Sequence, residues 1–132
     1  MALLKAWYAP LLVGLLALGI GLLTYHDVTG YEIADPHLSL LVSQAILEQG
    51  TVRLDAYVAR AEPPLDSYPP TGPLIVRDGH YYYYFPLGPS VFSLSFVAVA
   101  RWAGLDMARI VDNHYLQELI SSLLCAVAVP LV

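Results

Sequence analysis

The sequence has few charged residues for its length and no excess of positive ones. Of its 132 residues, 13% are charged and 58% are hydrophobic, a balance that is unusual for the surface of a soluble domain. Six Lys and Arg stand against eleven Asp and Glu, which gives a formal net charge of -5. A chain without a basic patch cannot neutralise a run of phosphates. Nucleic acid is therefore excluded as a partner.

Cysteine pairs and the signature motifs of soluble enzymes are also missing. The single cysteine, Cys125, excludes an internal disulfide and a cysteine-based zinc site. The chain has no GxSxG, GxGxxG, HExxH or Walker-type phosphate loop. His26, His37, His80 and His114 are too scattered to show the spacing of metal ligands. No metal site is predicted from these residues, and any catalysis would have to use isolated acids.

The most prominent feature that is present is a long apolar run near the N-terminus. Residues 6–25 carry no charge. At about 1.5 Å per residue, such a run covers the roughly 30 Å hydrocarbon core of a bilayer. Trp7 and Tyr25 lie at its two ends, where aromatic rings prefer the headgroup layer. The run predicts an N-terminal transmembrane helix over residues 1–25.

The charges around this run predict its direction. Lys5 precedes it and all eleven acidic residues follow it. The positive-inside rule therefore places the N-terminus in the cytoplasm and residues 26–117 outside the cell membrane. A cleaved signal peptide is the alternative interpretation of the run. The apolar core is longer than such peptides usually have, and it ends without a small-x-small site.

A short helix is predicted over residues 36–49, with Asp35 as its N-cap, Pro36 at its first position and Gly50 just past its end. Its apolar residues recur at helical spacing, and its polar residues fall toward the other side. The polar set is Ser39, Ser43, Gln44 and Glu48. This pattern predicts a juxtamembrane amphipathic helix that lies in the membrane interface or packs on other helices.

The rest of the chain predicts an irregular loop, a hairpin and two further apolar segments. Four prolines between residues 51 and 71 disfavour regular structure, whereas Asp78-Gly79 between β-favouring residues predicts a small β-hairpin at 74–85. Residues 86–103 predict a re-entrant or interfacial helix, and 118–132 the start of a second, apparently truncated transmembrane helix. The expected fold class is thus a mainly α integral membrane protein.

Two groups of residues in the external segment could carry chemistry. Asp27, Glu32 and Asp35 fall close together after the first apolar run, and carboxylates there could accept a proton or ligate a divalent ion. Helix capping is the alternative role of Asp35. The four consecutive tyrosines at 81–84 could anchor the chain at the interface or stack on a sugar ring.

The segments ADPHLSLLVSQAILEQGTVRLD and DGHYYYYFPLGPSVFSLSFVAVARWAGLD resemble the N-terminal portion of GT-C fold glycosyltransferases. The resemblance implies a multi-pass enzyme of the cell membrane that takes sugars from polyprenyl-phosphate-linked donors on the outer face. It also implies that Asp35, or alternatively Asp27, activates the acceptor hydroxyl or binds a divalent metal ion. The family often has Asp-Glu at this point, whereas this chain has Ala34-Asp35.

A second family element has the form Tyr-Tyr-x-Lys-aromatic-Pro-Pro-Gly, and here Tyr84 stands in the place of its lysine. A phenol can donate one hydrogen bond to phosphate but brings no positive charge. The resemblance implies that the substrate-binding residues include His37, Arg77, Tyr82 and Tyr84. The predicted partners are membrane lipid and the polyprenyl-phosphate sugar donor. The alternative function is a non-catalytic small membrane protein whose outer loop binds or anchors a partner.

Overall fold

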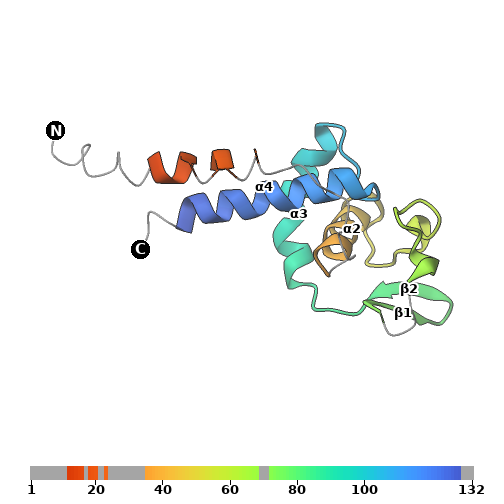
Figure 1. Cartoon of the computed structure of the whole chain (residues 1–132). Helices are drawn as coiled ribbons and strands as arrows, with labels where there is room; N and C mark the ends of the chain where they lie inside the picture. Colours follow the sequence, from red (N-terminus) through yellow and green to blue (C-terminus); the bar gives the residue numbers. More distant parts are fainter. Residues whose placement is uncertain (1–11, 17, 21–22, 24–34, 69–71, 129–132) are drawn as a thin grey trace. The chain divides into compact units, whose positions relative to one another are not determined.

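A computed structural model describes residues 12–16, 18–20, 23, 35–68 and 72–128 (Figure 1). The chain divides into two compact units. One comprises residues 29–116, and the other comprises residues 1–28 together with 117–132. Each unit is described by itself below. The larger unit carries most of the described structure and all the candidate residues except Asp27.

The predicted fold class, a mainly α integral membrane protein, is wrong in its membrane-spanning part. In the ranges described, no helix combines the length and the apolar character needed to cross a bilayer. Helices α2 (Asp35–Gln49) and α3 (Gly88–Trp102) have 15 residues each. Helix α4 (Ile110–Ala128) has 19, but Asp112 and Glu118 lie in its first half. Much of the predicted helix over residues 1–25 lies outside the described residues.

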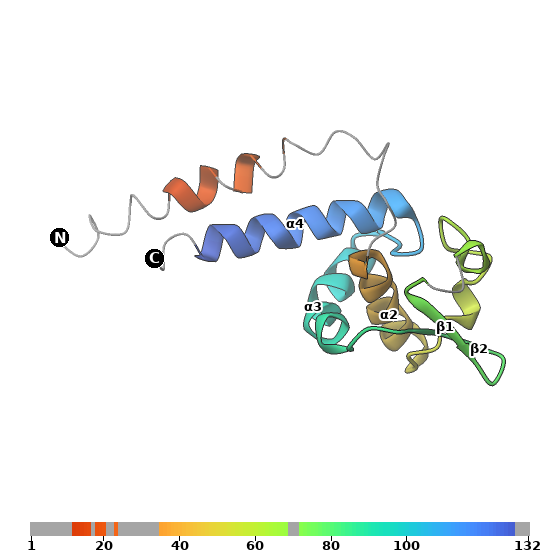
Figure 2. The same ribbon diagram turned by 60° about the horizontal axis from the view of Figure 1, so that its bottom comes forward.

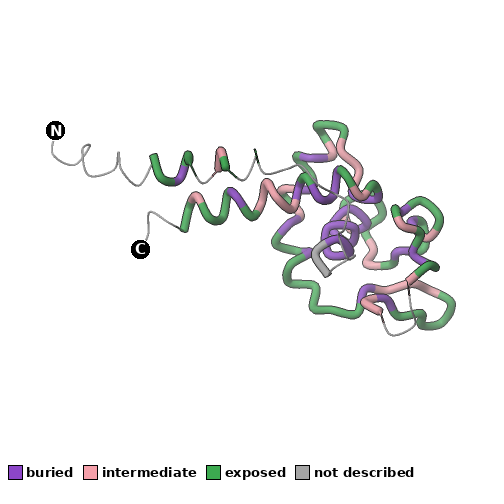
Figure 3. The backbone as a smooth tube through the Cα atoms, viewed as in Figure 1, coloured by how far each residue is buried: buried purple, intermediate pink, exposed green. Residues whose placement is uncertain are grey.

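Helix α2 is the centre of the larger unit and not an amphipathic surface helix. Every residue from 37 to 45 is buried (Figure 3). Ser39, Ser43 and Gln44, expected on the polar side, are 6%, 0% and 0% exposed. The predicted polar outer side is wrong, because the spacing of polar residues does not show which neighbours surround each side chain. The alternative of packing on other helices agrees with the contact between α2 and α3. These polar groups are buried because other segments supply them with hydrogen bonds.

Helices α2 and α3 lie side by side (Figure 2). Their contact involves small residues. The Ser43 hydroxyl oxygen lies 2.8 Å from the carbonyl oxygen of Ser90 and 2.9 Å from the hydroxyl oxygen of Ser93. Both serines of α3 are buried, together with Val97 and Ala100 on the same helix. Short side chains let two helix backbones approach closely. The seam between these helices is therefore held by hydroxyl contacts as well as by apolar packing.

The predicted hairpin is confirmed. Strands β1 (Leu74–Arg77) and β2 (His80–Tyr83) pair antiparallel, with Leu74 opposite Tyr83 and Arg77 opposite His80. Asp78 and Gly79 form the turn with φ of 53° and 78°. Positive φ at both central residues is what a two-residue type I′ turn requires. The strands end at residue 83, two residues before the predicted boundary.

The segment between α2 and the hairpin is more ordered than its prolines suggest. It contains two short 3-10 helices, η1 (Asp55–Tyr57) and η2 (Leu65–Ser67). The core of the unit, which surrounds α2, extends toward the hairpin through three almost fully buried side chains, those of Leu54, Tyr57 and Leu65. Arg53 also forms an isolated antiparallel bridge with Tyr82 of β2. Apolar residues spaced along this segment thus fasten it to the unit.

The smaller unit contains helical residues 12–16 and 18–20 and the last part of α4. Gly14 lies close to the backbone of α4 in this unit. A Cβ atom at this position would lie 2.8 Å from the carbonyl oxygen of Ala126. Only a residue without a Cβ fits this approach without a shift of the backbone.

Candidate functional site

The first turn of α2 contains two of the residues predicted to carry chemistry. The helix begins at Asp35, and His37 follows two residues later. The imidazole of His37 is buried, and its Nε2 atom has no hydrogen-bond partner among the described residues. Burial lowers the pKa of His37 from 6.5 to about 4. The ring is therefore neutral at neutral pH.

Asn113 of α4 holds this turn in place. Its Nδ2 atom donates to the carbonyl oxygen of His37 at 3.0 Å and to that of Met107 at 2.8 Å. Asn113 is 0% exposed, and the flanking Asp112 and His114 are also buried. One amide side chain thus joins the start of α2 to the loop that precedes α4. The backbone carbonyl of His37, two residues after Asp35, thus accepts a hydrogen bond from a residue 76 positions away.

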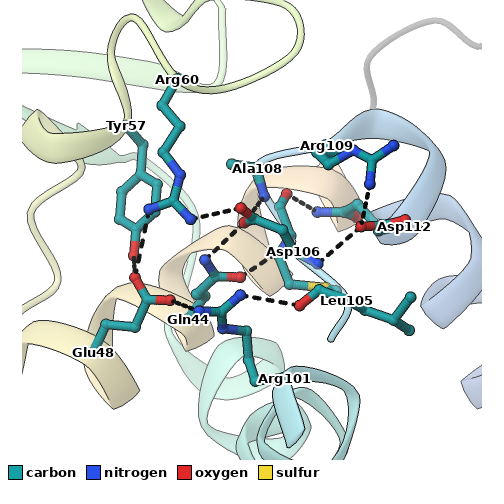
Figure 4. A network of polar contacts seen from close by, with 12 residues as sticks. Gln44, Glu48, Tyr57, Arg60, Arg101, Leu105, Asp106, Ala108, Arg109 and Asp112 are labelled. Atoms are coloured by element: carbon teal, nitrogen blue, oxygen red, sulfur yellow. Dashed lines mark hydrogen bonds and ion pairs between the residues drawn. The ribbon is translucent and has the colours of Figure 1, made fainter. Parts of the chain in front are cut away.

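A second polar contact joins the middle of α2 to the same loop (Figure 4). The Nε2 atom of Gln44 donates to Asp106 Oδ1 at 2.8 Å, and its Oε1 atom accepts from the backbone N–H of Met107 at 2.7 Å. The other carboxylate oxygen of Asp106 accepts from Arg60. Burial by itself raises the pKa of Asp106, but these hydrogen bonds outweigh it and leave the pKa below its ordinary value. Asp106 is thus a charged anchor of the loop.

The carboxylate of Glu48, near the end of α2, contacts two guanidinium groups and one phenol (Figure 4). One carboxylate oxygen lies 2.6 Å from Arg101 Nη2, and the other accepts from the hydroxyl of Tyr57 at 2.7 Å and lies 3.8 Å from Arg60 Nη1. Burial, and then the bond to Glu48, raise the pKa of Tyr57 above its ordinary value. The carboxylates of Glu48 and Asp106 are balanced in charge by the guanidinium groups of Arg60 and Arg101. Such a balanced set stabilises the unit and leaves no net charge for a ligand.

The hairpin is tied to the rest of the unit by Asp55. One carboxylate oxygen accepts from the backbone N–H of Tyr81 at 2.8 Å, and the other lies 2.7 Å from His80 Nδ1. The bond from Tyr81, more than the pairing with His80, lowers the pKa of Asp55. The backbone N–H of Leu54 donates to the carbonyl oxygen of Tyr81 at 2.9 Å. These bonds fix the orientation of β2 and of the tyrosines that it carries.

Three of the predicted substrate-binding residues lie on or next to the hairpin. Tyr82 is half-buried on β2 opposite Ile75. Tyr84 follows the strand and is 67% exposed. The guanidinium of Arg77 is exposed near the turn, 3.9 Å from the carboxylate of Asp78. The structure thus groups Arg77, Tyr82 and Tyr84 on one supersecondary element, whereas His37 belongs to α2.

Of the two candidate acids, only the backbone of Asp35 falls within the described residues. Asp27 lies outside the described residues. Asp35 is described as the first residue of α2, but its side chain lies outside the described residues. In the part of the chain that is described, no three His, Cys, Asp or Glu side chains gather to hold a metal ion. The role of Asp35 as base or metal ligand therefore stays a prediction.

Sequence reasoning missed Asn113, Gln44 and Asp106, which organise the region around the candidate acid. Gln44 was assigned to an outward face because it lies between apolar positions of a helix. The only signal is the presence of Asp106, Asp112 and Asn113 within eight residues of a mixed polar and apolar segment after Gly104. That spacing does not reveal which side chains turn inward. Only the fold brings the Asn113 amide within hydrogen-bonding distance of the His37 carbonyl oxygen.

Comparisons of this chain with models of protein families, with curated proteins and with solved structures gave no match.

Proposed function

We propose that this chain forms the N-terminal part of a glycosyltransferase that takes sugars from a polyprenyl-phosphate-linked donor on the outer face of the cytoplasmic membrane. The observation that carries the proposal is the start of α2 at Asp35, with a backbone fixed by the bond from Asn113 to His37. The proposal requires that the acid at the head of this turn be held in one place relative to its substrates. Such positioning supplies a large part of enzymatic rate enhancement.

The proposed reaction uses Asp35 as general base. Its carboxylate takes the proton of an acceptor hydroxyl while that oxygen forms a bond to the anomeric carbon of the donor sugar. The bond between that carbon and the phosphate oxygen breaks, and polyprenyl phosphate leaves with the electron pair. Proton, sugar and leaving group are thus all accounted for. A divalent ion bound by Asp35 is the alternative role that the family resemblance implies for this residue.

His37 and the hairpin have separate parts in this proposal. Because His37 is buried and neutral, it acts as a positioning residue for the first turn of α2. Tyr84 is exposed and follows directly after β2, so its hydroxyl is available to donate to the phosphate of the donor. Arg77 is an exposed cation at the turn end of the same hairpin, from which it can attract an anionic donor.

The test compares Asp35→Asn with Asp66→Asn in membranes of cells that produce the natural gene product. Asp66 lies on the exposed side of η2, so it serves as a matched acid outside the first turn. Transfer of radiolabelled sugar from a polyprenyl-phosphate donor should fall about 100- to 10,000-fold for Asp35→Asn, the usual contribution of a general base. It should stay unchanged for Asp66→Asn.

Two results would contradict the proposal at different points. Full transfer by Asp35→Asn would remove the base assignment but keep the glycosyltransferase. Absence of transfer by the unmodified protein, with any polyprenyl-phosphate sugar offered, would remove the function itself. The second candidate function, a non-catalytic protein whose outer segment binds a partner, would then account better for the neutral, self-paired charges around Glu48 and Asp106.

A further inference from the structure

Helix α3 has large apolar residues on the outside and smaller residues inside. The inward side consists of Ser90, Ser93, Val97 and Ala100, all of which are buried in the larger unit. The outward side exposes its bulky residues, with exposed fractions of 57% for Val91, 58% for Phe92, 65% for Val99 and 91% for Trp102. Burial of these four side chains would be strongly favourable in water, so their exposure calls for a partner surface.

These exposed side chains form one continuous stripe. At 100° per residue, positions 91, 92, 95, 99 and 102 fall within an arc of about 100° around the helix. The stripe includes Ser95 as its only polar member, and the rings of Phe92 and Phe96 lie 5.8 Å apart at its edge. The chain carries no charge between residues 84 and 100. Arg101 turns away from the stripe and pairs with Glu48 of α2.

We infer that this stripe, together with Tyr84 and Trp102 at the two ends of the segment, lies in the headgroup layer of a lipid membrane. The helix lies along the surface and does not cross it, because its 15 residues span only about 22 Å. Its apolar arc contacts the upper acyl chains. The phenol and the indole N–H remain among the headgroups, where amphipathic rings are most stable.

The chemistry of the stripe favours lipid over a protein surface. Protein interfaces carry about one hydrogen bond per 100–200 Å² and are enriched in arginine. The outward face of α3 offers one serine hydroxyl along its length and the indole N–H of Trp102 at its end, and Arg101 is already paired. The smaller unit, taken by itself, also exposes Leu16 and Leu23. A single docked protein would cover one apolar patch. A bilayer can accept apolar residues exposed on separate parts of the chain.

The two tryptophans of the chain make a local test feasible. In a Trp7→Phe variant, Trp102 is the only indole. The full chain is added to phosphatidylcholine vesicles whose acyl chains carry bromine near the headgroup or near the chain end. We expect a blue shift of Trp102 emission and stronger quenching by bromine near the headgroup. This depth measurement does not depend on sugar transfer, so it stands or fails apart from the proposed function.

Two variants in the same background show whether the stripe drives the contact. Phe92→Ser with Val99→Ser removes apolar groups that are already exposed, so the fold, checked by circular dichroism, should persist. Quenching of Trp102 should then require at least tenfold more lipid. The control Val76→Ser changes an equally exposed residue on β1 and should leave quenching unaltered.

Three results would overturn the inference. The first is an absence of Trp102 quenching while the protein floats with the vesicles. The second is quenching that does not respond to the double serine variant. The third is a dimer, detected by sedimentation, in which Trp102 emission is blue-shifted without lipid and returns to that of exposed indole in the double variant. The stripe would in that case bind a second copy of the chain.

Discussion

The side-chain oxygen of Gln44 accepts a hydrogen bond from the backbone N–H of Met107 at 2.7 Å, across 63 positions of the sequence. The same amide donates to Asp106, so one side chain satisfies two groups of the loop between α3 and α4. Gln44 is 0% exposed. Water therefore cannot replace it.

Replacing Gln44 by Leu should destabilise the protein by about 1–3 kcal/mol, because it leaves the Met107 N–H buried without a partner. The free energy of unfolding in urea measures this loss. Gln49→Leu is the matched control, since Gln49 is exposed at the end of the same helix, and it should change stability by less than about 0.5 kcal/mol. Equal losses in the two variants would show that the buried amide contributes nothing specific.

The stability of the protein should depend on pH through His37. Its pKa is about 4 in the folded protein and 6.5 without burial, so the unfolded chain binds the proton more readily. The free energy of unfolding should therefore be unaffected by His37 above pH 6.5. It should fall progressively as the pH falls from 6.5 to 4, by up to about 3 kcal/mol. The lowered pKa values of Asp55 and Asp106 act in a lower window, below their ordinary 3.8.

Unfolding measured between pH 4 and 7 should therefore show a slope that disappears in His37→Leu. The variant should be at least as stable as the natural protein at pH 5, because leucine does not have to be kept neutral. His114→Leu tests a second buried histidine of the same region. If the slope survives in His37→Leu and disappears in His114→Leu, the assignment to His37 is wrong.

Gly14→Ala should loosen the smaller unit, because its Cβ would lie 2.8 Å from the carbonyl oxygen of Ala126. Amide hydrogen exchange in the last two turns of α4 should become faster. Gly19→Ala is the control, since nothing lies within 4 Å of its Cβ position. Alanine is favoured over glycine in a helix by about 1 kcal/mol, so this variant should slow the exchange or leave it unchanged.

Tyr84→Lys should strengthen binding of the phosphate-bearing donor if the proposed function is correct. The residue is exposed, so the change should not disturb folding. An ammonium group adds a charge-assisted bond to phosphate that a phenol cannot give, and we expect the KM for the donor to fall severalfold. Val76→Lys places the same charge on β1 and should leave KM unchanged. An equal effect of the two variants would show that nonspecific attraction is responsible.

Local sequence signals predicted local structure well. Asp35, Pro36 and Gly50 mark the ends of α2, and Asp78-Gly79 marks the hairpin, because caps and turns depend on neighbouring residues alone. The bounds of the re-entrant or interfacial helix predicted at 86–103 correspond to those of α3, Gly88–Trp102, while its placement in a membrane stays a prediction. The environment of these elements was not predictable in the same way. The length of an apolar run likewise did not establish a membrane span.

The candidate site illustrates the same limit. The position of Asp35 at the start of a helix could be predicted from the residues around it. The support of that turn by Asn113 depends on α4, and the hydrogen bonds of buried Gln44 depend on the loop before α4, more than 60 residues away. Periodicity assigned Gln44 to the polar side of the helix because hydrophobic patterns group every amide with the polar residues. Long-range hydrogen bonds decide otherwise in this fold.

The serine contacts between α2 and α3 set a rule for variation at this seam. Ser43, Ser90 and Ser93 are buried where two backbones run close together, so the limiting quantity is side-chain volume and not polarity. Selection from a randomised library at these positions should return glycine, alanine, serine and cysteine, and should reject leucine and phenylalanine. Substitutions at these three positions are thus limited to small residues, whereas residues on the outward face of α3 can be replaced far more freely without loss of folding.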